Sequence, residues 1–143
     1  GAVTVEAEGD PAIVSMCHCT QCQRRTGSTY SVHAYFLRGA ATIRGETRSH
    51  RRSGDTGCYI TFHFCPVCAS TLHWDVEAMP DMVGIPVGVF ADPAFPLPTT
   101  SIFVPQKHPW VVVPDGVPQN DGHGAAFLEA ARAALAKREG DGA

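Results

Sequence analysis

Three cysteines lie within six residues near the N-terminus, in the segment CHCTQC at residues 17–22. A second pair, Cys65 and Cys68, has the same C-x-x-C spacing as Cys19 and Cys22. Two sulfurs at this spacing can face one ion, and zinc prefers tetrahedral sites built from thiolates and imidazoles. Clustered thiols without a secretory signal indicate metal or redox chemistry rather than a disulfide framework. The sequence therefore predicts a bound metal ion, most simply Zn²⁺.

The spacing leaves open how the cysteines share metal ions. The two C-x-x-C units could form one closed, structural four-cysteine site, in which Cys17 would have no role as a ligand. Alternatively, residues 17 and 19 of an extended segment project to the same side, so Cys17, Cys19 and Cys22 could all reach one ion. A three-cysteine site keeps a fourth position open, which is typical of catalytic zinc. Such a site can bind a substrate thiol and lower its pKa.

The elements expected around the cysteines are mostly β-strands. Alternating or β-branched segments predict strands over residues 2–7, 12–17, 30–37, 40–45, 47–52, 58–64, 70–74, 82–90, 101–106 and 109–114. A short helical turn is expected after the first cysteines, ended by Gly27. The Ala-rich residues 124–140, with an apolar stripe, predict the one long helix. We therefore expect a mainly β domain over residues 1–122, followed by a C-terminal helix and tail over 123–143.

Composition bounds the class of protein. The chain has 143 residues, of which 44% are hydrophobic and 17% charged, as in a globular domain. It has no apolar run long enough for a membrane span and no recognisable secretory signal, so we expect a cytoplasmic protein away from membranes. The net charge of -3 argues against general nucleic-acid binding. Seven of the eleven basic residues nevertheless lie between Arg24 and Arg52. We expect these to be solvated, with a local patch for a small anion or carboxylate as the alternative.

Two motifs in order resemble a known family. The segment CHCTQCQRRTGS, followed about forty residues later by FCPVCAS, resembles the glutathione-dependent formaldehyde-activating enzyme (GFA) family, which includes centromere protein V. The later segment KHPWVVVPDGVP is similar to that family's closing segment, so the resemblance spans roughly residues 1–118. It implies a zinc-binding β-tent fold, shared with small zinc-binding chaperones of Rab GTPases.

The resemblance also implies roles for the cysteines. Cys17, Cys19 and Cys22 match the family's open, catalytic zinc site. Cys65 and Cys68 match half of its structural four-cysteine zinc site, whose other half is a C-x-C just before a strand start. This chain begins at that strand start, with Gly-Ala-Val, so we expect the C-x-C to be missing from the chain as given. The family usually has Gly where this chain has Ala69, so we expect the turn there to be modestly strained or shifted.

The function implied by the resemblance is that of a carbon–sulfur lyase or synthase. It would act, with zinc, on the adduct between a thiol such as glutathione and formaldehyde or another small carbonyl compound, like S-(hydroxymethyl)glutathione synthase. The alternative is a non-catalytic zinc module that binds a protein partner. Arg24 and Arg25 could meet glutathione carboxylates, although a solvated helical turn is the simpler expectation. The apolar stripe of the terminal helix could pack on the domain or on a second subunit of a homo-oligomer.

The remaining chemistry-bearing residues have ordinary structural interpretations. His18 should point away from the neighbouring cysteines. We expect structural roles for the strand histidines, although one of them could shuttle a proton. Cys58 should be a small buried hydrophobe. Both tryptophans, Trp74 and Trp110, are expected in the core, with a pocket position as the alternative for Trp110.

Overall fold

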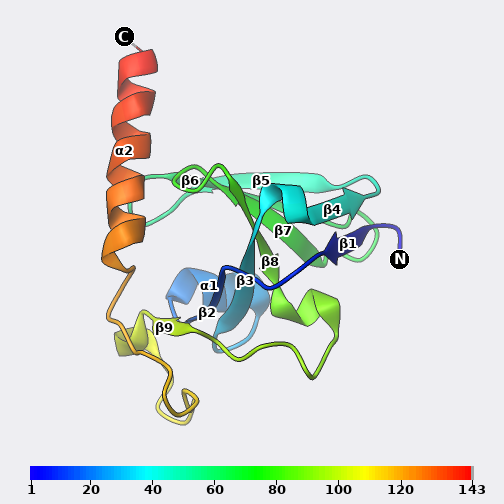
Figure 1. Ribbon diagram of the computed structural model, residues 1–143, viewed down its shortest axis with the longest axis vertical. Helices are drawn as coiled ribbons and strands as arrows, with labels where there is room; N and C mark the ends of the chain where they lie inside the picture. The colour runs from blue at the N-terminus through cyan, green and yellow to red at the C-terminus, as the bar shows by residue number, and fades with distance from the viewer. Residues whose placement is uncertain (143) are drawn as a thin grey trace.

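The computed structural model describes residues 1–142 and is mainly β (Figure 1). Its strands are β1 (Thr4–Ala7), β2 (Ile13–Cys17), β3 (Ser31–Leu37), β4 (Ala41–Arg44), β5 (Arg48–Ser53), β6 (Tyr59–Phe64), β7 (Thr71–Val76), β8 (Met82–Pro86) and β9 (Thr100–Ile102). Its helices are α1 (Thr20–Thr26), α2 (Ala125–Asp141) and the 3-10 turns η1 (Arg38–Ala40), η2 (Val87–Phe90) and η3 (Val104–Gln106). The predicted fold class, a mainly β domain of the β-tent type with a C-terminal helix, is confirmed.

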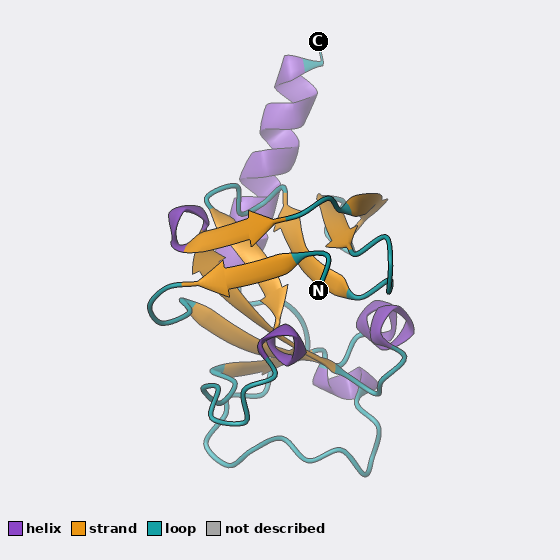
Figure 2. Cartoon of the chain, turned by 90° about the vertical axis from the view of Figure 1, so that its right-hand side faces the viewer, coloured by secondary structure: helices purple, strands orange, loops and turns teal. Residues whose placement is uncertain are grey.

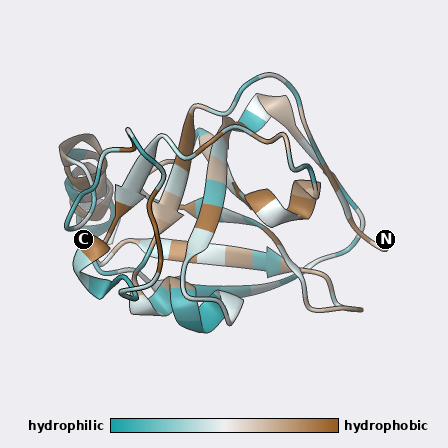
Figure 3. Ribbon diagram, turned by 90° about the horizontal axis from the view of Figure 1, so that it is seen from below, coloured by the Kyte–Doolittle hydropathy of each residue, from teal (hydrophilic) through white to brown (hydrophobic). Residues whose placement is uncertain are grey.

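Seven strands form one sheet in the order β5-β6-β7-β8-β3-β2-β9, and β1 pairs with β4 in a second, two-stranded sheet. Neighbours in the large sheet are antiparallel except β2 and β9, which are parallel. Figure 3 shows bands of hydrophobic and hydrophilic residues along some of the strands. Successive side chains of a strand point to opposite faces of its sheet. This alternation gives the large sheet two distinct faces.

One face of the large sheet carries the main aliphatic core. Val14, Ala34, Phe36, Val83 and Ile85 are buried there, and residues of β1 and β4 pack against them. Figure 2 shows this smaller sheet beside the N-terminus, in front of the large sheet. The opposite face carries the alternate residues of the same strands, and it is this face that holds the cavity described below.

The C-terminal helix α2 packs on its own domain mainly through its first three turns. Phe127, Ala131 and Leu135 contact a core cluster that contains Cys58 and Trp74. The remainder of α2 extends beyond the sheet as a rod (Figure 1). Cys58 is 2% exposed, as expected for a small buried hydrophobe, and its Sγ donates a hydrogen bond to the Ala131 carbonyl at 3.4 Å. Among residues 1–142 no helix is long and apolar enough to cross a membrane.

Some predicted strands are wrong at the C-terminal side. The strand expected over 82–90 ends at Pro86 and continues as a 3-10 turn, and the one expected over 101–106 ends at residue 102. Residues 109–114 form no strand, although the segment is rich in valine. Proline at both ends of that segment removes two backbone donors, and no neighbouring strand pairs with it. Trp110 is 69% exposed, so its predicted place in the core is also wrong.

Candidate metal centre and substrate cavity

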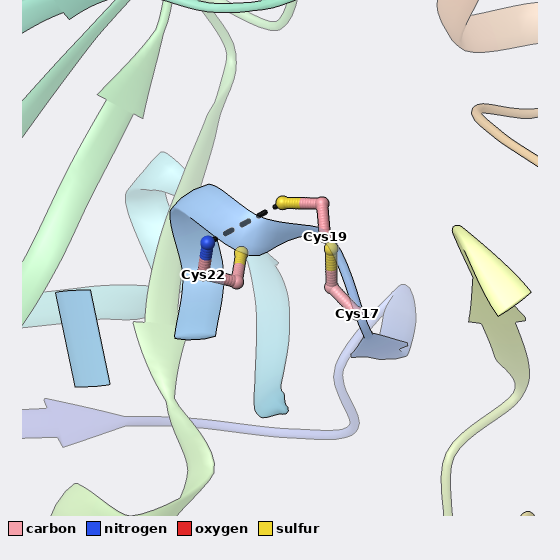
Figure 4. Close-up of side chains that lie close together, drawn as sticks. All are labelled: Cys17, Cys19 and Cys22. Carbon is pink, nitrogen blue, oxygen red and sulfur yellow. Dashed lines mark hydrogen bonds between the residues drawn. The ribbon is translucent and has the colours of Figure 1, made fainter. Parts of the chain in front are cut away.

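The first cysteine cluster lies where β2 passes into α1. Cys17 is the last residue of β2, Cys19 is the N-cap of α1, and Cys22 lies in its first turn. The Cys19 Sγ accepts a hydrogen bond from the Cys22 backbone N–H at 3.3 Å. The three Sγ atoms lie within 4.8 Å of one another (Figure 4). Strand end, cap and first helical turn therefore bring the three sulfurs to one point.

A second segment of the chain holds the cysteine loop in place. The His18 N–H donates to the Ile102 carbonyl at 3.1 Å, and the Thr20 N–H donates to Gln106 Oε1 at 2.8 Å. The Gln23 amide donates to the His18 carbonyl at 2.7 Å, and its Oε1 lies 3.0 Å from His108 Nε2. Sequence reasoning missed these positioning residues. No local signal pairs them, because most of the partners are more than 80 residues apart.

His18 lies between two of the cysteines but does not join them. Its side chain is fully buried, and its Nε2 lies 2.9 Å from Ser101 Oγ. Burial lowers the pKa of His18, and the nearby Lys107 ammonium lowers it further. A neutral imidazole therefore anchors the loop to β9 through Ser101.

The three thiols are electrostatically interdependent. Hydrogen bonds from Cys17 and Cys22 lower the pKa of Cys19, whereas the hydrogen bond to Cys19 and burial raise the pKa of Cys17. Cys19 thus ionises most readily of the three, and its negative charge disfavours ionisation of Cys17 and Cys22. All three ionise together only when a cation offsets their mutual repulsion.

The spacing of the sulfurs fits a metal ion. In tetrahedral coordination, thiolates at about 2.3 Å from Zn²⁺ lie about 3.8 Å from one another. The three Sγ atoms lie within 4.8 Å of one another, which leaves room for that spacing. Cys17, Cys19 and Cys22 could therefore hold one metal ion.

The second cysteine pair lies apart from this group. Cys65 is buried and Cys68 is exposed, and both line a separate hollow together with Gly1, Ala2 and Val3. Within residues 1–142 neither of them joins the three clustered sulfurs. The structure thus does not bring the two C-x-x-C units into one site, and metal binding by the second pair stays a prediction.

Ala69, directly after this pair, has a φ of 60°. Its backbone N–H donates to the Cys65 carbonyl at 2.9 Å, which closes the turn. The left-handed conformation costs an alanine more than a glycine. The strained turn expected at this position is therefore present.

A cavity of about 520 Å³ opens beside the three sulfurs. It lies on the face of the large sheet opposite the aliphatic core, because alternate residues of β2, β3, β6 and β7 line it. Its lining from these strands and α1 includes Ile13, Cys17, Cys19, Cys22, Arg25, His33, Tyr35, Ile60, Phe62 and Trp74. A concave site of this size with a few convergent polar groups is typical of a small-molecule site.

Arg25 reaches from α1 into this cavity. Its guanidinium carbon lies 4.8 Å from the centre of the Trp74 ring and 5.1 Å from that of Phe62. One of its nitrogens, Nη2, donates to Ser31 Oγ at 2.9 Å, while Nε is buried without a partner. Among the described residues no carboxylate forms an ion pair with it. The expectation of a solvated turn holds for the exposed Arg24 and is wrong for Arg25.

Two further polar groups face the cavity in their neutral forms. Burial lowers the pKa of His33 to about 3, with a further contribution from Arg25, so this imidazole is uncharged at neutral pH. Burial raises the pKa of Tyr35 to about 12. The Tyr35 hydroxyl oxygen accepts a hydrogen bond from Trp74 Nε1 at 3.2 Å, which leaves its own proton free to be donated.

Another group that could hold a metal ion lies away from the cavity. His63, His73 and Asp75 offer ligand atoms within 4.8 Å of one another on β6 and β7. His63 Nε2 lies 2.8 Å from one carboxylate oxygen of Asp75, and Arg38 donates to the other at 2.7 Å. The two imidazole rings are stacked with centroids 4.2 Å apart. Sequence reasoning treated these histidines singly, although His73 and Asp75 have the alternate spacing that puts them on one face of a strand.

The fold and the site together define a mainly β protein with a cysteine-rich centre beside a small-molecule cavity. The sequence model of the family described as "Glutathione-dependent formaldehyde-activating enzyme" matches residues 1–106. The chain therefore belongs to this family, and the resemblance inferred from the sequence is confirmed. A crystal structure of a Rhodobacter sphaeroides protein is also similar, with a TM-score of 0.49 and 23% identity, covering 62% of this chain and 80% of that one.

Proposed function

We propose that the protein is a zinc-dependent enzyme that makes or breaks a carbon–sulfur bond. Its substrate would be the adduct between a thiol such as glutathione and formaldehyde or another small carbonyl compound. The observation that carries the proposal is the group of three sulfurs within 4.8 Å of one another, placed in the wall of a cavity of about 520 Å³. Membership of the family supports a thiol as one substrate.

Cys17, Cys19 and Cys22 would hold the metal. When bound there, zinc supplies a position at which a substrate thiol loses its proton and becomes a nucleophile. Three protein sulfurs leave that position free, as in other catalytic zinc sites.

Arg25 is the group best placed to bind the thiol substrate by its charge. Glutathione carries two carboxylates, and a guanidinium binds a carboxylate through paired, charge-assisted hydrogen bonds. Arg25 has a buried donor without a partner, and its stacking on Trp74 and Phe62 fixes the guanidinium in the cavity. A carboxylate bound there would orient the thiol toward the cysteines.

Tyr35 would support the change in charge during the reaction. When the thiolate sulfur bonds to a carbonyl carbon, the carbonyl π electrons move to the oxygen, which then takes up a proton. The raised pKa of Tyr35 keeps its hydroxyl protonated, so it can donate a hydrogen bond to that oxygen. In the reverse direction the same hydrogen bond would hold the adduct's hydroxyl oxygen as the carbon–sulfur bond breaks.

The first test compares zinc content and reaction rate. Elemental analysis of the unaltered chain and of Cys17→Ser should show that the variant binds no zinc or much less of it. Cys58→Ala is the matched control, because this cysteine lies apart from the three sulfurs and should leave zinc in place. The zinc-loaded protein should also accelerate formation of the glutathione–formaldehyde adduct above its spontaneous rate, followed by NMR. A zinc-loaded protein that neither binds glutathione nor changes this rate would instead be a non-catalytic zinc module.

The second test separates two neighbouring arginines. Arg25→Gln should raise the Kd for glutathione about 10- to 100-fold, which corresponds to the loss of hydrogen bonds to a charged group. Arg24→Gln is the matched control, since this side chain is exposed and does not line the cavity. Isothermal titration of both variants decides the point. Equal effects of the two substitutions would contradict the role of Arg25.

A further inference from the structure

The cavity is completed by residues that lie beyond the family match. That match ends at residue 106, yet the lining of the cavity continues on Asn120, His123, Gly124, Ala126, Phe127 and Ala130. These six residues, here called the C-terminal wall, belong to the loop before α2 and to its first turns. The part of the chain that the family model does not describe therefore shapes the site.

The C-terminal wall is held firmly against the sheet. His123 Nε2 lies 3.0 Å from an Asp55 carboxylate oxygen, and its ring packs on Phe103 and Phe127 with centroids 5.0 and 4.2 Å away. Further along α2, Arg138 donates to Glu77 at 3.0 Å. Contacts at both its start and its later turns therefore attach the helix to the sheet beside the cavity.

This side of the cavity combines polar residues, among them Arg52, Asn120 and His123, with an apolar surface. Ala126, Phe127 and Ala130 come from the C-terminal wall, and Ile60, Val76 and Met79 face the same cavity from the sheet and the turn after it. The charged carboxylate nearby, that of Asp55, is already paired with His123. A group derived from formaldehyde has no apolar carbon chain to bury against such a surface.

We propose that the apolar part of the C-terminal wall, Ala126, Phe127 and Ala130, forms a subsite for an alkyl or aryl group attached to the sulfur-bound carbon of the substrate. The preferred adduct would then derive from an aldehyde larger than formaldehyde. This inference rests on the proposed function for the identity of the thiol, and it adds the chemical class of the carbonyl partner. Each methylene buried there strengthens binding about four-fold, so a chain of several carbons dominates the selectivity.

Binding of two thioethers tests the subsite without relying on catalysis. Isothermal titration of the zinc-loaded protein should give at least 10-fold tighter binding of S-hexylglutathione than of S-methylglutathione. Ala130→Gln, which places a polar group in the wall, should reduce this ratio at least three-fold. Ala133→Gln is the matched control, because Ala133 is exposed on the same helix and does not line the cavity. Should Ala130→Gln fail to fold, Phe127→Leu serves as a milder change in the same wall.

Each result bears on one proposal. The subsite would be overturned if the unaltered protein bound the two thioethers equally or bound neither. It would also be overturned if Ala130→Gln and Phe127→Leu left the ratio of the two affinities unchanged. If the protein binds the longer thioether more tightly but does not accelerate adduct formation, the proposed subsite is supported and the proposed carbon–sulfur enzyme activity is contradicted. If the protein accelerates formation of the formaldehyde adduct but binds the two thioethers equally, the proposed activity is supported and the proposed subsite is contradicted.

Discussion

Gly84 supports the aromatic floor of the cavity, and replacing it by alanine should be costly. Gly84 pairs with Trp74 on β7 and with Tyr35 on β3. A Cβ added at Gly84 would lie 2.5 Å from Trp74 Cε2 and 2.8 Å from Cδ1. Unbonded carbon atoms prefer about 3.5–4.0 Å, so the indole would have to move by about 1 Å. Trp74 is only 3% exposed and packs on His33 and Phe62, so a shift of the indole disturbs these contacts.

The expected loss of stability follows from these contacts. Overpacking of a filled core costs about 1–3 kcal/mol, and loss of the Trp74–Tyr35 hydrogen bond adds about 1 kcal/mol. We therefore expect Gly84→Ala to lower the free energy of unfolding by about 2–4 kcal/mol. Because Arg25 stacks on Trp74, the same change should also weaken glutathione binding.

Urea unfolding of the zinc-loaded protein measures this effect. Gly88→Ala is the matched control, since a Cβ at Gly88 would meet no atom within 4 Å. Both substitutions restrict the unfolded chain equally, so their difference isolates the contact with Trp74. If the two variants unfold within about 0.5 kcal/mol of each other, which is the usual range of neutral changes, the reasoning about Trp74 fails.

Three further predictions concern the backbone and the pH dependence of stability. Ala69→Gly should raise the free energy of unfolding by up to about 1 kcal/mol, because it relieves a φ of 60°; an unchanged or lower thermal midpoint would count against strain at this turn. Gly45→Ala should lower it by about 2 kcal/mol in urea unfolding, since φ is 103° and the new Cβ would overlap the Ala2 carbonyl; a neutral effect would refute that contact. Burial, with the nearby His63, lowers the pKa of His73 to about 4, so the unfolded chain takes up a proton below about pH 6.5 while the folded protein does not. The free energy of unfolding should therefore fall as the pH is lowered from 6.5 to 4. His73→Phe should make this fall less steep by up to about 1.4 kcal/mol per pH unit. An unchanged pH dependence in the variant would mean that the buried imidazole of the folded protein already carries its proton.

Features that depend on neighbouring residues were predictable from the sequence. The three clustered cysteines lie within six residues, so strand alternation and one helical turn suffice to bring their sulfurs together. The left-handed turn at Ala69, the helix end at Gly27 and the C-terminal helix are likewise local. Backbone conformation at such points is set by a few adjacent side chains, which one sequence contains in full.

Features that depend on a partner far along the chain were not predictable. Arg24 and Arg25 are identical in type and adjacent, yet only the docking of α1 on the sheet directs one to Trp74 and leaves the other in solvent. The apolar segment 109–114 has the composition of a strand but forms none.

The sequence by itself determined the family, the strand-rich class and the cluster of three sulfurs that could hold a metal ion, because these rest on residue type and short spacing. Only the tertiary structure decided that the two cysteine pairs stay apart, that Arg25 enters the cavity, and that α2 closes it. Those outcomes depend on which surfaces bury each other. Burial is a property of the whole folded chain, and short-range patterns do not encode its long-range pairings.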